Sequence, residues 1–253
     1  MKAKISLVAI LFLCAAFVFP YESTKKLSLP SQGIEKLEVD CAAGFLKISG
    51  IEGLAKIEVT AEIIVKGKRV RDEEEFIREN IELSLEKRGT KAVLVSKFRE
   101  SFPYISFRTK VINLTVNVPK NINLRIDDSS GSMSVEDIIG QLDIEDSSGD
   151  IYITDIKGNV DIDDSSGDIE AIAISGYLKI DDGSGGIDVK DVVGDVSIDD
   201  GSGSIYVNNI GGSVTVSDGS GSINIDGVEK DVIIKDDGSG GVKISNVKGN
   251  IRK

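Results

Sequence analysis

The sequence contains no histidine and no tryptophan, and only two cysteines occur among its 253 residues. Without histidine, the chain cannot form the Ser–His or Cys–His pairs of nucleophilic catalysis, and a zinc site would lose its usual nitrogen ligand. Cys14 lies in the apolar N-terminal segment, which leaves Cys41 as a single cysteine that cannot form an internal disulfide. We therefore expect neither a histidine-dependent enzyme nor a disulfide-stabilised domain.

Basic residues are scarce in the second half of the chain. Up to Lys120 there are 20 basic and 15 acidic residues, whereas residues 121–253 contain 10 basic and 27 acidic residues. The two parts carry net charges of +5 and −17, which give −12 for the whole chain. Such an acidic surface repels nucleic acid and anionic lipid, and it attracts divalent cations or basic surfaces. The simpler interpretation of the acidic excess is the solvation of an exported protein.

The second half contains an 18-residue unit that is repeated seven times. A glycine that closes an acidic turn marks each unit, and the sequence separation of successive marker glycines is 18 five times and then 19. These glycines are Gly131, Gly149, Gly167, Gly185, Gly203, Gly221 and Gly240. A period held through seven units requires a structure that itself repeats.

Five apolar positions recur in each unit, at +2, +4, +7, +11 and +13 counted from its marker glycine; in one unit they are Ile151, Ile153, Ile156, Val160 and Ile162. Pairs separated by two positions predict short strands with one buried face, which Ile and Val suit. A second glycine at +9, such as Gly158, predicts a corner with unusual backbone angles. The other corner reads Asp-Ser-Ser-Gly or Asp-Gly-Ser-Gly, where Asp and Ser oxygens accept nearby backbone N–H groups.

Two strands and two corners in each unit predict one rung of an all-β fold, a single-stranded parallel β-helix or β-solenoid. Its rungs would stack about 4.8 Å apart, so that the five apolar positions form continuous columns in the core. An antiparallel meander is the alternative, because the Asp-x-Ser-Gly turns could also close hairpins. The solenoid is favoured, because its stacked rungs place like residues above one another once in every 18-residue unit. A meander of hairpins does not require the same residues to recur with that period.

The N-terminus has the features of an export signal. Residues 1–20 contain Lys2 and Lys4 followed by an apolar run from Ile5 to Phe19. This run is shorter than the roughly 18 apolar residues of a membrane span, which predicts a signal peptide that is either cleaved or kept as an anchor. Residues 21–32 are expected to be a linker.

One unit of the repeat precedes the segment that interrupts it in the first half of the chain. Residues 33–57 keep its spacing, with Cys41 in the position that Asp takes elsewhere, and predict a degenerate first rung. Residues 58–120 break the repeat, and 121–253 resume it as the seven-repeat solenoid. The interruption contains alternating strands (Ile57–Val65, Ala92–Phe98 and Ile105–Val118) and one helix (Asp72–Asn80) with acidic residues at its start. A solenoid needs a cap over its first rung, and this mixed segment is expected to supply it.

These motifs resemble those of the bacterial putative adhesin family of β-strand-repeat proteins. The resemblance rests on the exported N-terminus, the opening Val39-Asp40-x-x-x-Gly44-x-Leu46-x-Ile48-x-Gly50, the strand into Val118-Pro119, and the Gly-x-Ile-x-Val and Ile-Asp-Asp-Gly-Ser repeats. It covers about residues 30–253. It implies an extracytoplasmic β-helical protein, and it supplies no catalytic or binding residues, because the shared motifs are structural.

A column of acidic turn residues is the first candidate for chemistry. Its members are Asp128, Asp146, Asp164, Asp182, Asp200, Asp218 and either Asp236 or Asp237. Carboxylates stacked at the rung spacing repel each other by on the order of 0.8 kcal/mol per pair even in water, so something must offset the repulsion. Hydrogen bonds within the turns explain the column most simply. Calcium between rungs is the alternative, but the acid here precedes the glycines, unlike in calcium-binding β-rolls.

A second candidate is the column at +3 from the marker glycine, which contains Tyr152, Glu170, Asp188 and Tyr206. Two tyrosines that bracket two acids on a flat face could stack on sugar rings and bond their hydroxyls. Ordinary exposed strand residues would give the same pattern. The sequence therefore permits a glycan site here without requiring one.

Taken together, the sequence predicts a bacterial, extracytoplasmic protein of the periplasm, cell surface or medium. We expect no enzyme, cofactor or small-molecule substrate, because enzymes built on β-helices break the repeat to form a cleft and these rungs are nearly unbroken. We expect an adhesin-like protein that binds an extracytoplasmic protein or glycan, but no nucleic acid, through rigid display. The alternative is a periplasmic structural or regulatory component that acts through residues 58–120.

Overall fold

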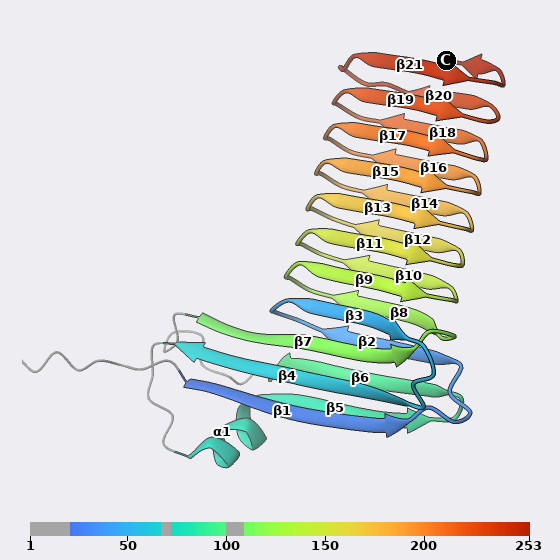
Figure 1. The fold of residues 1–253 in the computed structure, drawn as a ribbon. Coiled ribbons are helices and arrows are strands. Elements are labelled where there is room, and N and C mark those ends of the chain that lie inside the picture. Colours follow the sequence, from blue (N-terminus) through green and yellow to red (C-terminus); the bar gives the residue numbers. More distant parts are fainter. Residues whose placement is uncertain (1–20, 67–71, 100–108) are drawn as a thin grey trace, which may run out of the picture.

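The structure is a computed structural model that describes residues 21–66, 72–99 and 109–253. It is a straight rod of stacked β-strands that rises from a broader base (Figure 1). Two eleven-stranded sheets make up these residues, and each rung gives one strand to each sheet. The fold class predicted from the repeat, a parallel β-solenoid with one short helix, is therefore confirmed.

The first sheet has the order β1-β4-β7-β3-β9-β11-β13-β15-β17-β19-β21. Its strands in the base and first rung are β1 (Tyr21–Pro30), β4 (Lys56–Lys66), β7 (Thr109–Pro119) and β3 (Leu46–Ile51). The repeats add β9 (Met133–Ile138), β11 (Ile151–Ile156), β13 (Ile169–Ile174), β15 (Ile187–Val192), β17 (Ile205–Ile210), β19 (Ile223–Val228) and β21 (Val242–Val247).

The second sheet has the order β22-β20-β18-β16-β14-β12-β10-β8-β2-β6-β5. The base contributes β5 (Ile81–Arg88), β6 (Lys91–Phe98) and β2 (Lys36–Cys41). The repeats add β8 (Asn123–Asp128), β10 (Leu142–Asp146), β12 (Val160–Asp164), β14 (Leu178–Asp182), β16 (Val196–Asp200), β18 (Val214–Asp218), β20 (Val232–Asp236) and β22 (Ile251–Arg252).

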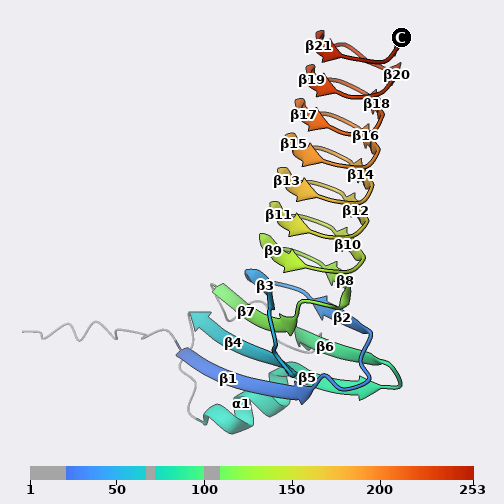
Figure 2. The same cartoon turned by 45° about the vertical axis from the view of Figure 1, so that its right-hand side comes forward.

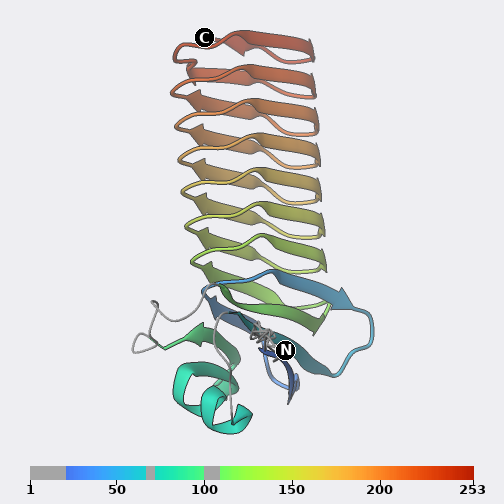
Figure 3. The same ribbon diagram turned by 90° about the vertical axis from the view of Figure 1, so that its left-hand side faces the viewer.

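The register of the repeats is parallel and follows the period of the sequence. Ile151 pairs with Ile169 in the first sheet, and Val160 pairs with Leu178 in the second. The meander alternative is therefore wrong, since it requires antiparallel neighbours. The five apolar positions face inward and are buried in every repeat except the last, where Ile251 is exposed, so that the core is a narrow file of aliphatic side chains between the sheets. Figure 3 shows the rungs stacked one above another along this axis.

Cys41 takes the predicted place in the first rung. Strand β2 pairs with β8 so that Leu37 lies beside Leu124 and Cys41 beside Asp128, and β3 pairs with β9 through Leu46 and Met133. The degenerate rung at 33–57 is thus part of the solenoid. It precedes β6 and β7 in the chain but lies between them and the repeats (Figure 2).

The base differs from the prediction in two respects. First, β6 pairs in parallel with β2, and β7 pairs in parallel with β3. These two strands of the segment that was expected to be the cap therefore form a further rung of the solenoid. Second, residues 21–30, predicted as part of a linker, form β1, which pairs antiparallel with β4 along its whole length. Strand β1 alternates half-buried and exposed side chains, which lets Leu27 and Leu29 pack on the core. The end of the rod is closed by the antiparallel strands β1, β4 and β5.

The predicted helix is confirmed as α1 (Glu73–Asn80). The Asp72 side chain caps it by accepting the Glu75 backbone N–H at 2.9 Å, as expected for Asp at this position. The ring of Phe76 lies edge-on against Tyr21 of β1, with the ring centroids 5.4 Å apart. The helix is thereby fixed on the closed end of the rod.

The two glycine columns are needed for different reasons. Marker glycines such as Gly185 have a positive φ of 153°, and a Cβ there would also collide with the carbonyl of Gly167 one rung below. The second column, for example Gly194, does not have positive φ, so that the prediction of unusual backbone angles there is wrong. A Cβ at Gly194 would instead lie 2.8 Å from the backbone nitrogen of Tyr177 and closer still to Gly176. Close stacking of the rungs explains these glycines.

Candidate functional site

The aspartate column predicted from the sequence is buried. We define it as Asp128, Asp146, Asp164, Asp182, Asp200 and Asp218, which end the strands β8, β10, β12, β14, β16 and β18. These residues pair directly from rung to rung, and their exposed fractions are only 0–5%. Asp236 ends β20 but is exposed, and the register shifts by one residue beside it. The column is thus a single file of six carboxyl groups inside one edge of the rod.

One oxygen of each carboxyl group holds the turn. The Oδ1 atom of every member accepts the backbone N–H of the residue two positions on, at 2.8–3.3 Å; Asp218 and Ser220 make the shortest of these bonds. This confirms the turn interpretation of the Asp-x-Ser-Gly corner. The serine hydroxyls do not bond these carboxyl groups: Ser148 and Ser166 donate instead to the carbonyls of Ser129 and Ser147, at 3.4 Å.

The other oxygen is an orphan. In all six members Oδ2 is buried and has no hydrogen-bond partner among the described residues. A buried carboxylate oxygen without a partner is costly, and the cost falls when the group takes up a proton. Burial, together with the charges of the neighbouring column members, raises the pKa of Asp146 to about 7 and that of Asp182 to about 6. Partial protonation therefore offsets part of the repulsion between the stacked carboxyl groups.

The calcium alternative has no geometric support in the described ranges. No group of three or more Cys, Asp or Glu side chains converges there so as to hold a metal ion. The hydrogen bonds to Oδ1 aim each carboxyl group at its own turn. Calcium binding by the column remains a prediction to be tested, with the local turns as the better supported explanation.

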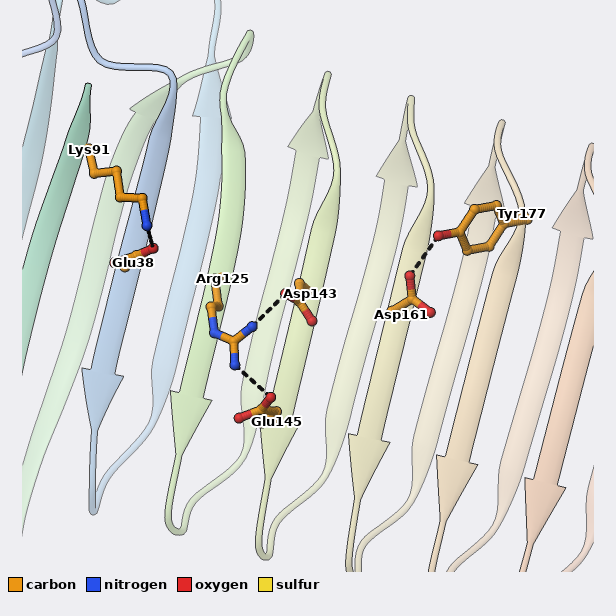
Figure 4. Close-up of polar contacts among 7 residues, drawn as sticks. All are labelled: Glu38, Lys91, Arg125, Asp143, Glu145, Asp161 and Tyr177. Carbon is orange, nitrogen blue, oxygen red and sulfur yellow. Dashed lines mark hydrogen bonds and ion pairs between the residues drawn. The ribbon is translucent and has the colours of Figure 1, made fainter. Parts of the chain in front are cut away.

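The outward face of the second sheet carries polar contacts that cross the rungs (Figure 4). Near the base, Arg125 donates to Asp143 at 2.9 Å and to Glu145 at 2.6 Å. Higher up, the Tyr177 hydroxyl donates to Asp161 at 2.7 Å. This cluster was not predicted from the sequence, although Arg125 and Asp143 are separated by one period of the repeat, a spacing that indicates side-by-side positions on neighbouring rungs.

The same face presents a column of exposed acidic residues. We call it the outer acidic column: Asp127, Glu145, Asp163, Asp181 and Asp199, one residue per rung and each next to a buried aspartate. Arg125 bonds one member of it, Glu145. The repeated Asp-Asp pairs of the sequence thus separate into an inner carboxyl group that holds a turn and an outer one that faces solvent.

The first sheet brings together the second predicted candidate. Tyr152, Glu170, Asp188 and Tyr206 occupy adjacent positions on β11, β13, β15 and β17. They line a shallow groove with a volume of about 280 Å³, together with Asp168, Ile169, Gly186, Ile187 and Ser204. The two tyrosines are 42% and 50% exposed, so that their rings remain available to a ligand. We call this the tyrosine groove.

The described residues contain no helix of the length and apolarity that crossing a membrane requires.

Comparison with known proteins identifies the family. Residues 34–252 match the Toastrack DUF4097 family, so the chain belongs to it, and the family resemblance predicted from the sequence is confirmed. No curated protein matches the chain.

Several solved structures are similar in fold. One is described as a putative lipid binding protein from Parabacteroides distasonis: it has 13% identity and a TM-score of 0.50, over 92% of this chain and 96% of that one. Another, described as a putative adhesin from Bacteroides fragilis, has 12% identity and a TM-score of 0.46, over 91% and 96% of the two chains. A putative cell adhesion protein from Clostridium sporogenes has 17% identity and a TM-score of 0.38, over 92% and 98%. At these identities the likeness concerns the fold alone.

Proposed function

We propose that this protein is an exported, adhesin-like component of the bacterial cell envelope that binds its partners without catalysis. The observation that carries the proposal is the outer acidic column, which places one carboxylate on every rung from Asp127 to Asp199. Contacts that are weak one at a time become strong together when a rigid scaffold presents them at a fixed spacing. A straight solenoid is such a scaffold.

The continuity of the rungs supports a role without catalysis. From β8 to β18 each strand pairs with the next in unbroken register along the second sheet. The strongest pKa shifts belong to Cys41 and to the aspartate column, and all of these side chains are buried, out of reach of a substrate. The acidic faces also disfavour anionic lipid surfaces, which argues against lipid headgroups of that kind as the partner.

A second candidate is a periplasmic structural or regulatory component that acts through the base. The observation that favours it is a groove of about 310 Å³ between β1, β4 and β7, which is lined by residues including Lys26, Lys56, Glu58 and Asn117. Lys26 and Lys56 are exposed, whereas the outward face of the second sheet carries the outer acidic column. An acidic segment of another envelope protein would suit this groove.

Accessibility on cells separates the two candidates. The tagged full chain is probed with protease and antibody on intact cells and on lysed cells. Exposure on intact cells is expected, and protection until lysis would overturn the display proposal in favour of the internal component.

Matched variants then locate the working surface. Asp163→Asn with Asp181→Asn removes two of the five charges of the outer acidic column, and Lys26→Glu with Lys56→Glu reverses the charge of the two lysines in the groove at the base. Display predicts that the first pair weakens adherence of the producing cells while the second pair leaves it unchanged. The opposite result would assign the function to the base.

A further inference from the structure

The tyrosine groove has the dimensions of an extended ligand that runs along the rod. Tyr152 and Tyr206 stand at its two ends on strands three spacings apart, which is about 14 Å. An extended chain of pyranose rings advances by roughly one strand spacing per ring. The groove therefore matches about four rings, with the outer two over the tyrosines.

The two ends of the groove offer exposed aromatic surfaces. The Tyr152 hydroxyl donates to Asp150 at 3.3 Å, which ties the ring to its own strand and leaves it 42% exposed. Tyr206 is half exposed at the other end. Tyrosine rings pack against apolar surfaces through their faces while their hydroxyls bond polar groups, and the C–H face of a sugar ring is such a surface.

The middle of the groove is acidic. Asp168, Glu170 and Asp188 line it, and no Lys or Arg is among its lining residues. Lys190 lies two residues beyond Asp188 on the same strand and outside the groove. The negative charge of Asp150 raises the pKa of the Tyr152 hydroxyl, with further contributions from Glu170 and Asp168, so the negative potential reaches the tyrosine itself.

A glycine makes room beside these carboxylates. Gly186 occupies the position that Asp168 and Ser204 take on the neighbouring rungs, and its missing side chain leaves space between them. Its N–H donates to Asp168 Oδ1 at 2.8 Å, which fixes that carboxylate at the edge of the groove. A ligand in the groove would therefore meet positioned acceptors.

We infer that the tyrosine groove binds a linear oligosaccharide that carries free amino groups, of the glucosamine type. This inference rests on the proposed binding function and names the ligand class of one face. The ammonium groups pair with Glu170 and Asp188 through charge-assisted hydrogen bonds, while the outer rings stack on Tyr152 and Tyr206. Polymers of uronic acids are excluded by like-charge repulsion.

The test is calorimetric titration of the purified full chain with a glucosamine hexamer and, in parallel, with its fully N-acetylated counterpart. The free amine is expected to bind at least about tenfold more tightly, because acetylation removes the charge that the carboxylates recognise. No detectable binding of the amine, or equal binding of both sugars, would overturn the inference.

Variants assign the binding to the groove. Tyr152→Ala combined with Tyr206→Ala is expected to weaken binding at least about tenfold, since both stacking platforms are lost. Tyr177→Ala on the opposite sheet is the matched control, because that tyrosine is 41% exposed and also bonds an aspartate. All three side chains are exposed, and a melting curve for each variant checks folding. Binding that survives the double substitution, or that is lost equally in the control, would show general attraction to an acidic rod.

Two further outcomes separate the alternatives. A pentalysine peptide that binds as tightly as the sugar, with the same dependence on the tyrosines, would assign the groove to basic peptides and overturn the inference. Calorimetry uses purified protein, so an absence of sugar binding would not change the result of the accessibility experiment on cells. Conversely, protection of the chain on intact cells would not change the result of the sugar titration. The two proposals can thus fail separately.

Discussion

Cys41 lies directly beside Asp128, in the inward-facing position that the strands from β8 to β18 of the second sheet fill with aspartate. One rung further down, Ser96 lies beside Cys41. Burial raises the pKa of the Cys41 thiol, and the charge of Asp128 raises it further, so that the thiol stays neutral. The file of carboxyl groups therefore ends in two neutral side chains where the base begins, and its charge is confined to the repeats.

The rod is expected to become more stable as the pH falls from 8 to 5. The folded pKa values of about 7 for Asp146 and about 6 for Asp182 lie above the ordinary value near 3.9. A raised folded pKa contributes stability that is complete below the ordinary pKa and is lost as the pH rises through the folded pKa. The urea concentration at the midpoint of unfolding should therefore decrease from pH 5 to pH 8.

Acidification below about pH 4 should reverse this trend. Lys47 lowers the pKa of Glu136, and Lys91 lowers that of Glu38, so protonation of these surface carboxylates removes ion pairs. A midpoint that stays constant or rises from pH 5 to pH 8 would contradict protonation of the column.

Asp182→Asn should raise stability at pH 8 by on the order of 2 kcal/mol and change it little at pH 5. The amide keeps the oxygen that accepts the Ser184 N–H, and it carries no charge to repel the neighbouring Asp164 and Asp200. Asp181→Asn is the matched control, since this neighbouring residue is exposed. Urea unfolding of both variants at the two pH values measures the difference. Equal effects would mean that the repulsion lies on the surface.

The solenoid could be predicted because the sequence itself repeats with the period of one rung, but the whole base could not be predicted in this way. Ala92, Leu94, Leu114 and Val116 have the alternation of strands, yet no Asp-x-Ser-Gly corner marks them as a rung. Their parallel pairing with β2 and β3 joins segments that are far apart in the chain. Strand β1 was missed for the same reason: it ends at Pro30, and its partner β4 begins only at Lys56, so the pairing joins segments that are separated in the sequence.

The candidate site shows a similar division. The Asp-x-Ser turn could be predicted, because its hydrogen bond joins residues two positions apart. The orphan Oδ2 atoms could not, since a partner for them depends on how neighbouring rungs close over the carboxyl group.

A signal that the sequence does contain is a recurrent Asp or Asn at +6 from the marker glycine. Asp137, Asp155, Asp191, Asn209 and Asn246 occupy this position with φ between 55° and 64°.

Two units have other residues in that left-handed position: Gly227, with φ of 73°, and Ala173, with φ of 59°. Alanine has no side-chain oxygen to offset the steric cost of this conformation, which is about 1–2 kcal/mol. Ala173→Asn and Ala173→Gly should therefore each stabilise the protein by on the order of 1 kcal/mol. Thermal melting measures the change. Ala171→Gly, at a buried strand position two residues earlier, is the control and should destabilise. A loss of stability in both Ala173 variants would rule out strain at this position.

Gly194→Ala should destabilise the rod by on the order of 3 kcal/mol, because the new methyl group would meet the backbone of the rung below at Gly176 and Tyr177. Gly194 does not have positive φ, so the substitution tests close stacking apart from backbone strain. Gly241→Ala is the matched control: nothing lies within 4 Å of a Cβ there, and stability should hardly change. Because each rung of a solenoid contacts only its neighbours, the damage should be local, and limited proteolysis should cut first at the corner between β15 and β16. Equal stability of the two variants would mean that the rungs can separate slightly without cost, and that the glycine column is not required for stacking.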